Sequence, residues 1–175
     1  MAILIEAISV VIRCESLVNA YQGGVEAFSA AVPNKSLCAD GALAGVSFMT
    51  PNDAQVYAQH LESHGLKHKD EKGAVDFVVV DQLNGFCSHC DWAIFGKTDW
   101  NNDAQCPISV CTTQSAKKGS VVVPNGWKYE TSLSANHKYI DGDSIPENLK
   151  LIRKEKDADV FRDEETGKEF YMRRM

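Results

Sequence analysis

The chain lacks an excess of basic residues, and this limits the partners that it can bind. Its 175 residues include 18 Lys and Arg against 24 Asp and Glu, which gives a formal net charge of −6 spread along the sequence. Proteins that bind nucleic acid need a basic surface to neutralise the phosphates. The basic cluster of Lys150, Arg153, Lys154 and Lys156 is interleaved with acidic neighbours, which predicts a solvated face. We therefore expect no nucleic-acid partner.

A segment that would span a membrane or direct the chain to export is also missing. The longest apolar run, residues 2–12, is shorter than the roughly 20 residues that cross a bilayer, and Glu6 interrupts it. A secretory signal would need a basic stretch before this run and a small-residue cleavage site after it, and neither is found. We therefore expect a cytoplasmic protein without a membrane partner.

Several motifs of common enzymes are absent. The sequence contains no phosphate-binding glycine loop, no P-loop and no Gly-x-Ser-x-Gly nucleophile elbow. We therefore do not expect phosphoryl or hydride transfer through these motifs, and the sequence leaves open whether the protein is an enzyme.

What the chain does contain is enough apolar sequence for one folded domain. Hydrophobic residues make up 44% and charged residues 24%, which is ordinary for a globular protein. The opening run, AILIEAISVVI, is rich in β-branched residues and apolar on both alternating faces. This pattern predicts a central strand over residues 2–12 with both faces covered.

Glu6 is the charged residue within this run. A buried carboxylate is costly unless it is paired, protonated or bound to a metal. One interpretation makes Glu6 a ligand-binding residue or a general base. The other places its carboxylate at solvent or beside a Lys or Arg, because residues near a strand end are often half exposed.

Local signals predict further helices and strands in the first hundred residues. Thr50, Pro51 and Asp53 are residue types that begin a helix, and Gly65 is suited to end it. The expected helices cover residues 15–21, 25–31 and 51–64, and the expected strands cover residues 42–49, 74–80 and 91–95.

The rest of the chain is predicted to be rich in β-structure. A hairpin is expected over residues 120–129, around Pro124-Asn125-Gly126, and another over residues 159–172. A short helix is expected over residues 147–154. The fold class is therefore α+β, in one domain over residues 1–175. We divide it into an α+β core over residues 1–98 and a β-rich extension over residues 99–175 that ends in a hairpin.

The residues GVSFMTPNDAQVYAQHLESHGL, AVDFVVVDQLNG and DWAIFG resemble one module of the vicinal-oxygen-chelate, or glyoxalase-like, superfamily. This resemblance covers residues 42–96, and residues 2–37 resemble the opening of a preceding module. It implies a mixed sheet with two helices, a glyoxalase-like or ferredoxin-like βαββαβ core, which curves around a small-molecule or metal site. It also implies pairing of modules, and hence a homodimer.

The resemblance further implies that metal ligands would be His or Glu on strands that face the cup. Glu6 lies near the first of these strand positions. Residues 44–48 contain no His, however, and residues 91–95 contain no Glu. A standard metal triad is therefore missing.

Four of the six cysteines are candidate ligands of a zinc site, although the second pair has four residues between its members where two are usual. Without an export signal, reduced thiols or a metal site fit better than disulfides. Cys87 and Cys90 have knuckle spacing, and Cys106 and Cys111 follow after 15 residues. Structural zinc held by these four residues, four reduced thiols in loops, and a redox pair at Cys87 and Cys90 all remain open.

Histidines and tryptophans supply the remaining candidates. His60, His64 and His68 are spaced four apart, but a helix that ends at Gly65 excludes His68 from a shared face, so we expect solvated histidines. Trp92 is a candidate ligand-binding residue, and the alternative for this ring is packing in the core.

Two functions are predicted. The first is a small-molecule-binding, glyoxalase-like protein without a standard metal triad, whose cup is lined by residues 3–12, 42–49 and 74–80. The second is a non-enzymatic protein-interaction module stabilised by structural zinc.

Overall fold

The apolar run that opens the chain forms two strands, β1 (Ala2–Ile5) and β2 (Ile8–Arg13), in this computed structural model. Ala7 between them has a φ of 46°, which is uncommon for a residue other than glycine. Its N–H donates to Gln82 Oε1 over 2.8 Å, and its carbonyl accepts from Gln82 N over 2.9 Å. The prediction of one strand over residues 2–12 is therefore wrong. The predicted burial is confirmed, because every residue from 3 to 12 is buried.

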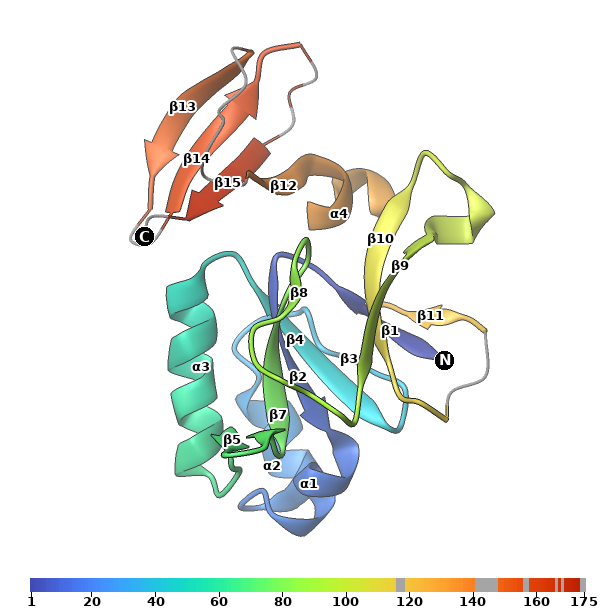
Figure 1. Ribbon diagram of the computed structural model, residues 1–175, viewed down its shortest axis with the longest axis vertical. Coiled ribbons are helices and arrows are strands. Elements are labelled where there is room, and N and C mark those ends of the chain that lie inside the picture. The colour runs from blue at the N-terminus through green and yellow to red at the C-terminus, as the bar shows by residue number, and fades with distance from the viewer. Residues whose placement is uncertain (116–118, 141–147, 156–157, 166, 168, 174–175) are drawn as a thin grey trace.

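The structure describes residues 1–115, 119–140, 148–155, 158–165, 167 and 169–173. Its fold class is α+β, with several sheets and a β-rich C-terminal part, as predicted (Figure 1). No helix in the described part of the chain is long and apolar enough to cross a membrane.

Strand β2 lies in the centre of the first sheet, an antiparallel sheet with the order β3-β4-β2-β7-β8. The other strands are β3 (Cys38–Ala39), β4 (Leu43–Phe48), β7 (Phe77–Asp81) and β8 (Gly85–Phe86). The strand predicted over residues 74–80 is split into β6 (Gly73–Ala74), which pairs with β5 (Lys69–Asp70), and β7. The break lies at Asp76, whose carboxylate accepts hydrogen bonds from Ser16 Oγ and Lys67 N.

Three helices near the N-terminus cover one face of this sheet: α1 (Cys14–Asn19), α2 (Gly24–Ala31) and α3 (Pro51–Ser63). All three lie close to their predicted positions. Thr50 Oγ1 accepts a 3.2 Å hydrogen bond from Asp53 N at the start of α3, as its sequence predicts. Gly65 follows the helix with a φ of 101°, and a Cβ there would lie 2.7 Å from the Ala20 carbonyl oxygen. Glycine is therefore required at this position.

The opposite face of the first sheet packs on a second, mixed sheet with the order β11-β1-β10-β9. Its later strands are β9 (Ile94–Asp99), β10 (Pro107–Thr112) and β11 (Val121–Val122). Figure 1 shows α3 on one side of the first sheet and β9 and β10 on the other. The boundary drawn between residues 98 and 99 falls inside β9, before its last residue, and β9 pairs with β10 along its whole length. Core and extension therefore share this sheet.

Two predictions in the second half of the chain are wrong. Residues 120–129 do not form a hairpin, because β11 pairs in parallel with β1 and residues 129–131 form a 3-10 helix. The predicted turn is nevertheless present, since Trp127 N donates to the Pro124 carbonyl over 3.0 Å. The helix predicted over residues 147–154 is instead β13 (Leu149–Lys154), which pairs with β14, and residue 147 lies outside the described residues.

The C-terminal sheet has the order β12-β15-β14-β13 and lies at one end of the molecule, beyond the short helix α4 (Leu133–Asn136) (Figure 1). Its other strands are β12 (His137–Ile140), β14 (Ala158–Asp163) and β15 (Glu169–Arg173). The predicted terminal hairpin is confirmed by the antiparallel pairing of β14 with β15.

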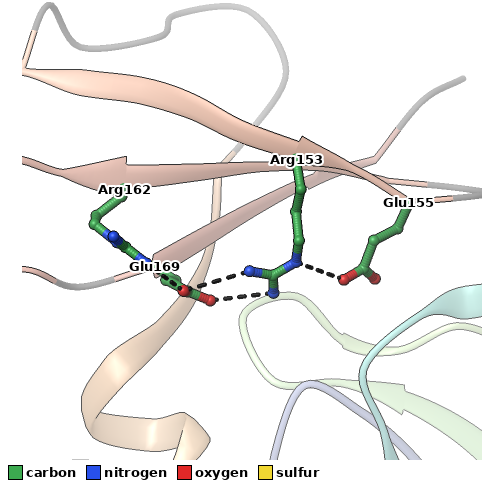
Figure 2. Close-up of polar contacts among 4 residues, drawn as sticks. All are labelled: Arg153, Glu155, Arg162 and Glu169. Carbon is green, nitrogen blue, oxygen red and sulfur yellow. Dashed lines mark hydrogen bonds and ion pairs between the residues drawn. The ribbon is translucent and has the colours of Figure 1, made fainter.

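Ion pairs join the strands of the C-terminal sheet at its surface. Figure 2 shows Glu169 between two guanidinium groups, 3.1 Å from Arg153 and 3.2 Å from Arg162. Arg153 also contacts Glu155 over 3.0 Å. These side chains are partly exposed, so each pair contributes about 0.2–1 kcal/mol to stability. The predicted solvated face is seen at Arg153, and Lys156 lies outside the described residues.

Candidate functional site

The cup predicted from the strand faces is filled by packed side chains. Val10 and Val46 are fully buried against the helices, and Val11 and Val78 are fully buried against the second sheet. Both faces of β2 therefore belong to cores, and a hollow remains at one end of the helix-covered face.

Glu6, a predicted ligand-binding residue, is buried and bonded to groups from the other half of the chain. Its Oε1 accepts hydrogen bonds from Trp127 Nε1 (3.1 Å), Ser134 N (3.0 Å) and Ser134 Oγ (2.8 Å). The sequence interpretation of Glu6 beside solvent or a basic residue is not what the structure shows. Neutral donors compensate the buried carboxylate and fix the segment that leads to the C-terminal sheet.

Trp92, the other predicted ligand-binding residue, lies half-buried at the edge of the core between the sheets. Its indole N–H donates to the Ala74 carbonyl over 3.0 Å, and the Arg13 guanidinium lies 5.7 Å from its ring centroid. These contacts match the packing interpretation of this ring. The strand predicted over residues 91–95 is β9 (Ile94–Asp99), which begins three residues later and leaves Trp92 outside it.

The four cysteines of the predicted zinc site occupy different environments. Cys87 is exposed, Cys90 and Cys106 are half-buried and Cys111 is buried. Cys106 precedes β10 and Cys111 lies near its end, so five residues of extended chain, roughly 16 Å, separate them. They cannot bind the same ion while β10 is intact.

Burial affects the chemistry of two of these thiols. It raises the pKa of Cys111 to about 12, and it also raises the pKa of Cys90. Both thiols are therefore protonated near neutral pH, whereas zinc binds thiolates. Among the described residues, no group of three or more His, Cys, Asp or Glu side chains is placed to hold a metal ion. Zinc binding stays a prediction.

The histidines divide between two places. His60 lies on α3 and His64 directly follows its last residue, with ring centroids 4.2 Å apart. His60 Nε2 lies 3.3 Å from the Tyr21 hydroxyl. They stack on tyrosines in a half-buried cluster, in contrast to the solvated histidines predicted. His68 stacks on Phe77 with a centroid distance of 4.7 Å.

The structure brings His68 and Cys87 to one hollow of about 510 Å³ beside the first turn of α3, which we name the α3 pocket. Ile8 and Val79 of the first sheet form its apolar floor. Its polar lining groups are Asn52, Gln55, His68, Lys69, Cys87 and Ser88. Of these residues, the sequence motifs made only His68 and Cys87 candidates for metal binding. The others have no distinguishing sequence signal, although Thr50-Pro51 marks the helix start that they adjoin.

His68 is the titratable group of the α3 pocket with a perturbed environment. Its Nε2 is buried, and no described protein group bonds to it. Burial lowers the pKa of His68 below its ordinary value, and the neighbouring Lys69 contributes in the same direction, while Glu62 acts against both. The imidazole is therefore neutral at pH 7 and offers one donor and one acceptor nitrogen. Lys69 is exposed and has no ion pair among the described residues.

Comparison of the chain with models of protein families, with curated proteins and with solved structures found no match. The glyoxalase-like resemblance therefore stays a prediction.

Proposed function

We propose that the protein binds a small organic anion in the α3 pocket. The observation that carries this proposal is the convergence of Lys69, His68 and the first turn of α3 around a hollow with an apolar floor. Its volume of about 510 Å³ lies within the range of small-molecule sites. Perturbed titratable groups cluster at such sites in general.

The charge of the pocket determines the kind of ligand. Lys69 is the charged residue among its described lining groups. The first turn of α3 adds a partial positive charge, which favours an anionic group. Pro51 has no N–H, and the N–H groups of Asp53 and Ala54 donate to Thr50, so the Asn52 N–H is the backbone donor left for a ligand. Ile8 and Val79 below favour an apolar body on the same molecule. A small carboxylic acid with an aromatic or aliphatic body fits both features.

Matched acids and amides test this proposal. Benzoate and butanoate should bind to the full chain in calorimetric titrations, and benzamide and butanamide should bind at least five-fold more weakly. Lys69→Gln should weaken benzoate binding about five-fold, which is equivalent to about 1 kcal/mol. Lys72→Gln, an exposed lysine outside the pocket, is the control and should leave binding unchanged.

A second variant tests the location. Ser88→Trp places a large side chain at the half-buried rim of the pocket, away from the buried core, and should abolish benzoate binding while the protein stays folded. Equal affinity for acid and amide, or benzoate binding that survives both Lys69→Gln and Ser88→Trp, contradicts the proposal.

A second candidate function is docking of a partner protein on β13. Leu151 and Ile152 are 46% and 38% exposed on this strand, and no described residue pairs with its outer edge. Lys150 pairs with Glu164 and Arg153 pairs with Glu155 and Glu169, so Lys154 is the basic residue of β13 that an extended acidic segment would meet. A synthetic peptide of alternating Glu and Val should bind the full chain, and Ile152→Pro should abolish that binding. An equal response from a Lys-Val peptide would rule this function out.

A further inference from the structure

A second and larger hollow, of about 810 Å³, lies against the second sheet, and we name it the Trp100 cleft. Val110 and Thr112 of β10 line it together with Ala2 of β1. Trp100, Asn101 and Asn102 lie at one side, where β9 ends, and residues 119–121 lie at the other, where β11 begins. The cleft shares no lining residue with the α3 pocket.

Gly96 lies next to residues that line this cleft. It lies opposite Val110 in the β9–β10 pair, and a Cβ built on it would meet nothing within 4 Å. Its φ is not in the left-handed region, so the backbone there accepts any side chain. A larger residue at position 96 would therefore fill space beside the cleft without straining the strand.

The indole of Trp100 packs edge-to-face against that of Trp127. Its centroid lies 4.8 Å from that of Trp127, with the rings at 76°, and Trp127 in turn donates its N–H to the buried Glu6. The Trp100 backbone N–H also bonds to the Cys106 carbonyl over 2.8 Å. A fixed, half-buried aromatic ring offers an apolar surface without a large loss of side-chain entropy on binding.

Asn101 and Asn102 supply hydrogen-bonding groups beside this ring. Both have left-handed backbone conformations, with φ of 53° and 59°, which Asn tolerates better than most residues. Their side chains are exposed, and neither has a hydrogen-bond partner in the part of the chain that the structure describes. Each carboxamide offers two donor hydrogens and an acceptor oxygen.

The charged side chains that line the cleft balance. Lys97 and Asp99 contribute one charge of each sign, and no other side chain in its described lining is charged. Met1 also lines the cleft, and its carbonyl accepts a hydrogen bond from Thr112 Oγ1 over 3.0 Å. The side chains therefore give the cleft no net preference for an anion or a cation, in contrast to the α3 pocket with Lys69.

We propose that the Trp100 cleft binds a neutral, polyhydroxylated molecule of the size of a monosaccharide. The apolar C–H face of a sugar ring stacks on the Trp100 indole. Its hydroxyls, which both donate and accept, pair with Asn101 and Asn102 and with the charged ends of Lys97 and Asp99. A sugar would use the aromatic ring and the two free carboxamides, and it needs no net charge from the side chains of the cleft.

The test uses the full chain with glucose, galactose, mannose and N-acetylglucosamine, and with glucuronate as the anionic counterpart of glucose. Saturation-transfer NMR and tryptophan fluorescence should detect binding of at least one neutral sugar with a Kd of about 10 mM or tighter. Saturation should be strongest at ring C–H protons, and glucuronate should bind no more tightly than glucose.

Three variants separate this proposal from binding elsewhere. Gly96→Leu should weaken sugar binding at least ten-fold, and Asn101→Gly should weaken it about five-fold because glycine keeps the left-handed backbone and removes the carboxamide. Asn125→Gly, at an exposed turn outside the cleft, is the matched control.

The proposal is overturned if none of the four neutral sugars binds, if glucuronate binds more tightly than glucose, or if Gly96→Leu leaves sugar binding unchanged. Ser88→Trp, in the α3 pocket, should leave sugar binding unchanged. Failure of the sugar proposal can therefore be distinguished from failure of the anion proposal.

Discussion

At the scale of single residues, buried polar groups decide how distant parts of the chain meet. Glu6 bonds to groups more than 120 residues away, at Trp127 and Ser134. Ala7 and Gln82 exchange two hydrogen bonds across the turn that separates β1 from β2. Each contact removes a buried polar group from water and satisfies it with a specific partner, so a change at one partner leaves the other unsatisfied.

Glu6→Ala should destabilise the protein by about 2–4 kcal/mol, because it leaves the donors of Trp127 and Ser134 without their acceptor. Glu6→Gln keeps one acceptor oxygen and should cost less than half as much. Urea unfolding followed by tryptophan fluorescence measures both. The control is Glu15→Ala, since Glu15 is 72% exposed and its one ion pair in the described part of the chain is with Arg13 at the surface. A Glu6→Ala variant as stable as Glu15→Ala would show that this carboxylate does not hold the segment.

Stability should fall as the pH drops below about 6.5. Burial lowers the pKa of His60 and of His68 in the folded protein, and His64 also lowers that of His60. The unfolded chain therefore takes up these protons at a higher pH than the folded protein does. Unfolding becomes more favourable as the pH falls from the pKa of histidine in the unfolded chain through the lower pKa values of the folded protein. Urea midpoints across this range measure the loss. His68→Phe should reduce the slope, and an unchanged slope would contradict the assignment.

Cys87→Ser should leave both metal content and melting temperature unchanged. The Cys87 thiol is exposed, and β10 keeps Cys106 and Cys111 too far apart to complete a four-thiolate site with it. Metal analysis of the purified protein and thermal unfolding, with and without the substitution, provide the measurement. Stoichiometric zinc that Cys87→Ser removes, together with a drop in melting temperature, would restore the zinc interpretation.

At the scale of elements, local signals succeed where they agree with the final packing. Thr50-Pro51 and Gly65 predict the ends of α3, and its buried residues pack on the first sheet. The turn at Pro124–Gly126 also forms, but its flanks are not paired with each other because β11 finds a partner in β1. A short stretch of sequence does not reveal that a strand pairs with another strand more than 100 residues away.

Gly65→Ala should cost about 2–3 kcal/mol, because the new Cβ would meet the Ala20 carbonyl oxygen and the residue would hold a left-handed φ. Gly41→Ala is the matched control. Gly41 has a similar φ of 92° but open space around its Cα, so its substitution should cost only about 1 kcal/mol. Equal losses in chemical unfolding would mean that the contact between the α3 end and residue 20 is not tight.

At the scale of the whole molecule, the sequence predicts the fold class and the neighbouring helices and strands of the first half. The division of the opening run could not be predicted, because a positive φ at Ala7 has no local signal and depends on Gln82. The α3 pocket could not be predicted either. His68 and Cys87 are visible as chemical groups, but Lys69 and Ser88 become part of a site only when β5 and the loop after β8 lie beside α3.

The most direct test of the anion site is a pair of NMR titrations of the ¹⁵N-labelled full chain with benzoate and with benzamide. Benzoate should shift the backbone amide signals of Asn52, His68 and Lys69 and the imidazole signals of His68. Benzamide at the same concentration should not shift them, and Lys69→Gln should remove most of the response to benzoate. Shifts from benzoate confined to residues outside the α3 pocket, or equal shifts from both compounds, would contradict it.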